Sequence, residues 1–248
     1  MLHKTVGIVI RTQDYGETHK LVTIFTKKLG KVTAISRGAN RPRSRLSAVS
    51  QLFIEGDFLL YVNKGLGTLN QGEVIASYRN IREDLMRTAY AAYVAELTDK
   101  LLEEKDPDPF IYEQLKQTLD WMNEKAHYEI PVMMYELKLF QKGGFAPVID
   151  KCVNCGSTEK PFGFSIKEGG ALCPRCTTLD EQVISLEPAL FKVLSICLNV
   201  GLERVGKINV KEKNIRMLRS IIDQYYDRYG GFQLKSKKFL DQIDKFES

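Results

Sequence analysis

Four cysteines in two closely spaced pairs constrain this 248-residue chain more than any other feature of its sequence. Cys152 and Cys155 form the first CxxC pair, and Cys173 and Cys176 form the second after seventeen intervening residues. Each pair can present two thiolates to one metal ion, and this spacing between pairs is typical of a structural zinc site. Because four sulfur ligands leave no position for a substrate or an activated water, we predict one structural Zn²⁺ per chain.

Two other interpretations of the cysteine pairs stay open, since thiolates also bind iron–sulfur clusters and cysteines can form disulfides. The sequence has no apolar run long enough for a transmembrane helix, and it starts in a strand-like pattern without a signal peptide. We therefore expect a cytoplasmic protein with no membrane partner, in which thiols stay reduced and metal binding is favoured over disulfides. The fifth cysteine, Cys197, lies in an apolar segment and is expected in the core.

The first eighty residues predict a β domain. Segments rich in Val, Ile, Thr and Phe alternate with turn residues, as short strands do. These segments cover residues 5–12, 20–26, 30–36, 51–62 and 69–78. Five short strands predict a five-stranded oligonucleotide-binding (OB) barrel over residues 1–79. A small sandwich or an SH3-like barrel remains the alternative, because the number of strands does not fix their topology.

The hydrophobic period changes near Tyr78, where helical spacing of apolar residues begins. The predicted helices cover residues 81–102, 110–123, 131–140, 187–199, 214–229 and 237–246. The cysteine pairs fall between the third and fourth of these helices. The predicted fold class is therefore α+β: an N-terminal barrel, then a helical domain over residues 80–248 with a four-cysteine zinc module inserted at about 148–182.

Charge is distributed unevenly along the chain. Residues 1–80 carry twelve Lys and Arg against five Asp and Glu, a balance of +7, whereas residues 81–150 carry eight against fourteen, a balance of −6. A basic first third beside an acidic middle favours a polyanionic partner for the N-terminal part. On charge alone, a solvated surface explains the same pattern.

The segment 37–45, here called the arginine loop, concentrates the basic charge between two predicted strands. Its glycine and proline residues indicate a loop, and its four arginines are Arg37, Arg41, Arg43 and Arg45. Other basic residues on the preceding hairpin and nearby strands are Arg11, Lys20, Lys27, Lys28 and Lys31. Such cations neutralise phosphates and release counterions whatever the base sequence, so we expect a nucleic-acid backbone to follow this loop.

Aromatic residues of the barrel offer possible platforms for base stacking. The alternation of the strands predicts that most of Phe25, Phe53, Phe58 and Tyr61 belong to the core instead. Tyr15 lies in a polar turn and is the better stacking candidate.

Catalytic chemistry is poorly supported by the sequence. His3, His19 and His127 stand apart from any catalytic pattern, and no phosphate-binding loop, nucleophile elbow or zinc-protease motif is present. We expect a protein that is not an enzyme. Two alternatives stay open: a zinc-stabilised enzyme that modifies nucleic acid, such as a nuclease, and a scaffold protein that uses the barrel for protein contacts.

The assembled pattern resembles the bacterial RecO recombination mediators over essentially the whole chain. The segments that carry the resemblance are residues 6–44, residues 136–147 and the two cysteine pairs. The resemblance implies an OB barrel, a helical domain and a zinc module. It also implies a role in DNA repair and recombination: binding of single- and double-stranded DNA, annealing of complementary strands, and help in loading the RecA recombinase onto DNA coated by single-strand-binding protein.

The same resemblance implies partners and contact residues. RecR and the acidic C-terminal tail of single-strand-binding protein are the implied partners, RecA is an indirect one, and the bacterial nucleoid is the implied location. By position, the DNA contacts are chiefly Arg37 and Arg41. The supporting contacts are Arg11, Lys27, Lys28, Lys31, Arg43 and Arg45.

An acidic tail needs cations beside apolar side chains, and the C-terminal helices offer such a combination. The basic residues there are Lys207, Lys211, Lys213, Arg216 and Arg219. We expect the tail to bind near Lys213, Arg216 and Arg219.

Overall fold

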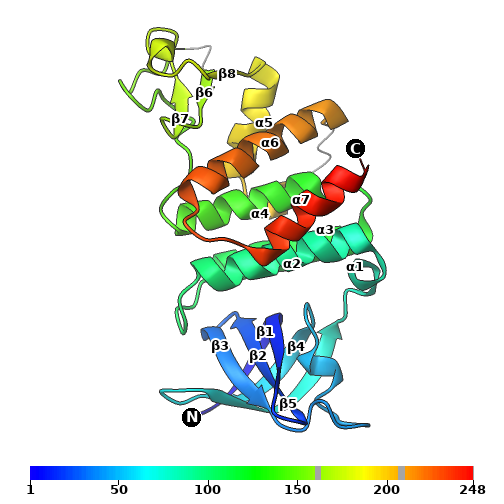
Figure 1. Cartoon of the computed structure of the whole chain (residues 1–248). Coiled ribbons are helices and arrows are strands. Elements are labelled where there is room, and N and C mark those ends of the chain that lie inside the picture. The colour runs from blue at the N-terminus through cyan, green and yellow to red at the C-terminus, as the bar shows by residue number, and fades with distance from the viewer. Residues whose placement is uncertain (160–162, 206–209, 248) are drawn as a thin grey trace. The chain divides into compact units, whose positions relative to one another are not determined.

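The computed structural model describes residues 1–159, 163–205 and 210–247, the last four by their backbone only (Figure 1). The chain forms two compact units. The first, here called the barrel unit, contains Met1–Tyr128 and Gln233–Ser248, and the second, the cysteine unit, contains Glu129–Phe232. Among the described residues, no helix has the length and apolar character needed to cross a membrane.

Five strands of the barrel unit close into a barrel (Figure 1). They are β1 (Leu2–Tyr15), β2 (His19–Thr26), β3 (Gly30–Ser36), β4 (Glu55–Tyr61) and β5 (Gly67–Ala76), in the spatial order β1-β2-β3-β5-β4. β3 and β5 are parallel, and the other pairs are antiparallel. The long strand β1 closes the barrel by pairing with β4 along its first half and with β2 along its second. This topology confirms the predicted five-stranded barrel.

The barrel is filled by apolar side chains from every strand. Its core includes Val9, Val22, Ile24, Phe58 and Leu69, all essentially buried. Burying each such side chain stabilises the fold by roughly 1.5–3 kcal/mol. The β-rich sequence therefore folds into a barrel because alternate residues face this shared interior.

The predicted strand over residues 51–62 begins too early. Residues 51–54 form a turn, in which Phe53 has a φ of 68° and donates its N–H to the Val9 carbonyl at 2.8 Å. β4 begins only at Glu55. The connection before it contains a short 3₁₀ turn, η1 (Ala48–Ser50).

Four helices belong to the barrel unit: α1 (Arg79–Glu83), α2 (Leu85–Leu101), α3 (Pro109–Glu124) and α7 (Lys235–Glu247). The predicted helix over residues 81–102 is interrupted, because extended Asp84 caps α2 by accepting the Arg87 N–H at 2.8 Å. Asp108 caps α3 in the same way, with Pro109 in the first turn. α7 packs along α2 (Figure 1), and Glu96 of α2 accepts hydrogen bonds from Lys235 and Ser236 at its start.

The cysteine unit contains α4 (Glu129–Lys142), α5 (Pro188–Asn199) and α6 (Glu212–Tyr229), with short 3₁₀ turns η2 (Thr177–Leu179) and η3 (Leu202–Arg204). A small sheet consists of β6 (Gly163–Ser165), β7 (Gly170–Leu172) and β8 (Ile184–Ser185). α4 is buried on every side from Ile130 to Phe140, as a central core helix is. Gly144, with a φ of 76°, follows its C-terminal end. Cys197 is buried, as predicted.

Candidate metal centre and nucleic-acid interface

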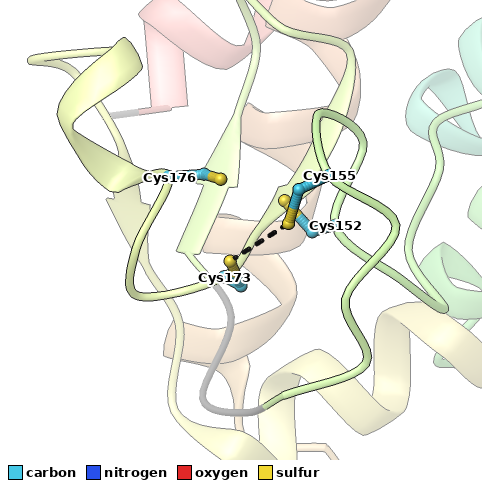
Figure 2. Close-up of side chains that lie close together, drawn as sticks. All are labelled: Cys152, Cys155, Cys173 and Cys176. Atoms are coloured by element: carbon cyan, nitrogen blue, oxygen red, sulfur yellow. Dashed lines mark hydrogen bonds between the residues drawn. The ribbon is translucent and has the colours of Figure 1, made fainter.

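The four paired cysteines converge on one point (Figure 2). Their sulfur atoms all lie within 4.8 Å of one another, and the Sγ atoms of Cys155 and Cys173 are 3.7 Å apart. A tetrahedron with Zn–S bonds of about 2.3 Å requires sulfur atoms about 3.8 Å apart. All four cysteines are free thiols, so the cluster fits a four-coordinate metal ion and does not contain a disulfide.

Local backbone geometry positions both pairs. Cys152 accepts the Gly156 N–H at 2.9 Å, and Gly156 has a φ of 72°, which glycine adopts without strain. The Val153 N–H donates to the Ala171 carbonyl at 2.8 Å, which fixes the first pair against β7. The second pair follows directly after β7, where the Cys176 N–H donates to the Cys173 carbonyl at 2.9 Å. The small sheet therefore holds the two turns together.

The pKa values of two of the clustered cysteines differ from the ordinary value for a thiol, in opposite directions. Burial raises the pKa of Cys152, but hydrogen bonds from the backbone of Cys155, Cys173 and Asn154 outweigh burial and lower that pKa to about 6. The Asn154 side chain lowers the pKa of Cys176, but burial and the neighbouring thiols outweigh it and raise that pKa to about 11. The Cys152 thiolate therefore forms readily, whereas the Cys176 thiolate forms with difficulty because burial and hydrogen bonds with the neighbouring thiols favour its protonated form. A bound dication would favour the deprotonated form of all four thiols, so the cluster can act as a metal site.

The arginine loop connects β3 to η1 and consists of successive turns. The Arg41 N–H donates to the Gly38 carbonyl at 3.0 Å, and the Ser44 N–H donates to the Arg41 carbonyl at 3.2 Å. Gly38 has a φ of 71°, and the aliphatic part of the Arg41 side chain lies over it. The loop is thus an ordered surface feature that presents side chains from fixed backbone positions.

All four arginines of this loop are exposed. Within the described part of the chain, none of Arg37, Arg41, Arg43 and Arg45 forms an ion pair. Lys28, at the turn between β2 and β3, is also exposed and likewise forms no ion pair with the described residues. These five cations are available to an external anion.

Three other predicted contacts have acidic partners inside the barrel unit. Arg11 and Lys31 pair with Asp99 of α2 at 3.4 and 3.2 Å, and Lys27 pairs with Glu113 of α3 at 2.5 Å. Lys31 is also buried. These side chains join the barrel to its helices, and they account for part of the basic–acidic asymmetry along the sequence.

The residues predicted to bind an acidic tail fall into two groups. Lys211, Lys213 and Arg216 are exposed on or beside α6, and Arg216 pairs with Glu212 one turn away. Arg219 is only 14% exposed and makes two bonds to the buried Glu136 carboxylate, at 2.7 and 2.8 Å. Arg219 is therefore part of the packing between α4 and α6. Lys207 lies outside the described residues.

The barrel aromatics divide in a similar way. Phe25, Phe53 and Phe58 are buried, which confirms that most of these aromatics belong to the core. Tyr61 is 46% exposed and Tyr15 is 47% exposed. Two aromatic rings on the barrel are therefore accessible to a ligand.

Sequence reasoning missed the hydrogen bonds that hold the arginine loop against the turn between β1 and β2. The Gly38 N–H donates to Nδ1 of His19 at 2.8 Å, and the Asn40 amide donates to Asp14 at 2.8 Å. The Asn40 N–H also donates to the Thr18 carbonyl at 3.0 Å. No local sequence pattern could have found these bonds, because the bonded partners are 19 to 26 residues apart in the sequence.

Family models and individual relatives that match this chain all belong to one group of DNA repair proteins. The family model described as "Recombination protein O N terminal" matches residues 1–78, and "Recombination protein O C terminal" matches residues 82–238. The protein named DNA repair protein RecO from Oceanobacillus iheyensis is 52% identical over 246 residues, which cover 99% of this chain and 95% of that relative.

Two further relatives with the same name extend the comparison. The one from Halalkalibacterium halodurans is 46% identical over 98% of this chain and 96% of its own length. The one from Bacillus cereus is 44% identical over 247 residues, with both chains fully covered. The structure agrees with these matches, since it contains a closed barrel, helices and a four-cysteine cluster. The two family models and the identity over the full length show that this chain belongs to the RecO family of DNA repair proteins.

Proposed function

We propose that this protein binds single- and double-stranded DNA and anneals complementary strands. With RecR, it would help to load RecA onto DNA coated by single-strand-binding protein, at the nucleoid in the bacterial cytoplasm. The observation that carries the proposal is the arginine loop, whose four exposed arginines form no ion pair within the described part of the chain. The proposed DNA-binding part is the barrel, residues 1–79.

The charge of the loop suits annealing. Two DNA strands repel each other through their phosphates, and a basic surface screens this repulsion and raises the local concentration of strands. Arg37 and Arg41 are the chief proposed contacts, with Lys28, Arg43 and Arg45 beside them. Since annealing makes and breaks no covalent bond, we propose that the protein acts without enzymatic chemistry.

We further propose that the metal is zinc and that its role is structural. The four-sulfur set and its 3.7 Å sulfur–sulfur distance suit tetrahedral Zn²⁺. Within its described residues, the proposed zinc segment, about 148–182 in the helical part 80–248, contains two short strands, β6 and β7, and the 3₁₀ turn η2. Zinc binding would supply folding free energy that such a segment lacks.

For the acidic tail of single-strand-binding protein, we propose a contact at Lys213 and Arg216 on α6. Both side chains are exposed. Titration of a labelled acidic tail peptide against Lys213→Glu/Arg216→Glu should show weakened binding, whereas Lys4→Glu on the barrel is the matched control. Equal affinity of the peptide for both variants would place the tail elsewhere.

The DNA-binding proposal is tested by fluorescence anisotropy of a labelled single strand at several salt concentrations. Each phosphate contact contributes about 0.7 to the slope of log affinity against log salt for single strands. If both arginines contact phosphates, Arg37→Ala/Arg41→Ala should weaken binding and reduce the slope by roughly 1.4. Arg79→Ala, which removes an exposed arginine from α1, should leave the slope unchanged.

The same samples distinguish the other functions. They contain Mg²⁺, and the DNA is analysed for cleavage after the titration. Intact DNA with steeply salt-dependent binding supports the annealing proposal. Cut DNA would favour a nuclease, and no binding at low salt would favour a protein scaffold.

A further inference from the structure

The turn between β1 and β2 and the arginine loop form one surface element. Tyr15 is the last residue of β1 and pairs in register with His19, the first residue of β2. His19 in turn accepts the Gly38 N–H, directly after Arg37. Because the neighbouring Asp14 also accepts from Asn40, Tyr15 lies next to the backbone that carries Arg37 and Arg41.

Among the residues that the structure describes, none forms an interaction with the ring of Tyr15 that explains its position. It is 47% exposed, and within the described residues it contacts no other aromatic ring and no cation face to face. A half-exposed aromatic ring at the end of a strand offers an apolar face to a planar ligand. The adjacent arginines indicate that this ligand is anionic.

We propose that Tyr15 stacks on an unpaired nucleotide base while Arg37 and Arg41 hold the phosphates beside it. Bases of a duplex are stacked on one another and must leave the stack before a side chain can cover them. Tyr15 therefore gives the protein a preference for single strands over duplexes. This inference rests on the proposed function, because it requires that DNA follow the arginine loop.

Three labelled probes separate the two kinds of contact. They are an oligo-dT strand, an abasic strand of the same length, which has the same phosphates but no bases, and a duplex. Base–aromatic stacking accounts for a loss of roughly 5- to 150-fold in affinity when the aromatic side chain is replaced by alanine. Tyr15→Ala should show this loss with oligo-dT, less than about twofold change with the abasic strand, and an unchanged salt slope.

Two variants serve as controls. Tyr15→Phe keeps the ring and should bind oligo-dT within about twofold of the wild type. Tyr61 is exposed to the same extent but pairs with Leu2 at the other end of β1, about 40 Å away along the strand at about 3.3 Å per residue. Tyr61→Ala should therefore bind all three probes as the wild type does.

The outcomes are distinct. A loss restricted to oligo-dT and reversed in Tyr15→Phe supports base stacking. An equal loss with oligo-dT and the abasic strand would overturn it, because Tyr15 would then act only on the position of the loop. If Arg37→Ala/Arg41→Ala weakens all three probes while Tyr15→Ala changes none, the stacking inference fails and the proposed function stands. If the wild type binds none of the probes, both fail.

Discussion

Replacing Arg219 by alanine should strongly destabilise the cysteine unit, although this residue was predicted to bind a partner. The Glu136 side chain that it contacts is 0% exposed, and Arg219 also bonds to Asp223 at 3.0 Å. Removing one member of a buried ion pair typically costs about 3–5 kcal/mol. The exposed Arg216, whose side chain is 78% accessible, pairs with Glu212 within one helix and should contribute no more than about 0.5 kcal/mol.

Hydrogen exchange measured by mass spectrometry is the suitable assay. A chain of two compact units does not give one two-state unfolding transition, so the exchange of α4 and α6 peptides must be followed separately. A loss of 3–5 kcal/mol corresponds to exchange roughly 100- to 4,000-fold faster in the most protected amides. Arg216→Ala should accelerate the same amides by no more than about threefold. If Arg219→Ala exchanges at the rate of Arg216→Ala, the assignment of Arg219 to the core is refuted.

Two other predictions concern the cysteine cluster and α7. Cys173→Ser should destabilise the cysteine unit and lower the zinc content of the purified protein, measured by hydrogen exchange of the β6 and β7 peptides and by metal analysis, while the folded fraction keeps its DNA affinity; a stable, folded variant without DNA binding would contradict a structural metal. Burial raises the pKa of Glu96, but hydrogen bonds from Ser236 and Lys235 outweigh it and lower that pKa below its ordinary 4.5. The stabilisation that Glu96 gives α7 is therefore fully present above about pH 4.5 and is lost as pH falls through the lower folded-state pKa. Exchange of α7 peptides should show this acid step in the wild type, and Glu96→Gln should lack it; identical pH profiles would reject the contact.

Local patterns were sufficient to predict the barrel, most helices and the cysteine cluster. Strand alternation, helical spacing and the CxxC turns depend on residues that are close together in sequence. The structure contains the strands, helices and cysteine cluster that these patterns predict. The errors occurred where a single residue changed the backbone. Asp84 divided a predicted helix by capping α2, and Phe53, with its positive φ, delayed the start of β4.

The basic residues could not be sorted in the same way, because their partners are distant in sequence. Lys27 and Glu113 are 86 residues apart, and Arg11 and Asp99 are 88 apart. Composition counts all these cations equally, whereas an ion pair inside the protein leaves less charge for an external phosphate. Only the fold shows that Arg37 and Arg41 keep their charge exposed while Lys31 is buried.

Some basic residues of the barrel contact its helices, whereas those of the arginine loop are exposed. Arg11, Lys27 and Lys31 link the barrel to α2 and α3, and Lys31 is buried in this contact whereas Arg11 and Lys27 keep about half of their side chains exposed. Nearby, the buried Glu55 of β4 accepts a hydrogen bond from Tyr112 of α3 at 3.2 Å, and burial together with this carboxylate raises the pKa of Tyr112. A neutral phenol and paired charges hold the barrel against its helices, and none of these groups belongs to the arginine loop or Tyr15, the surface proposed to hold DNA.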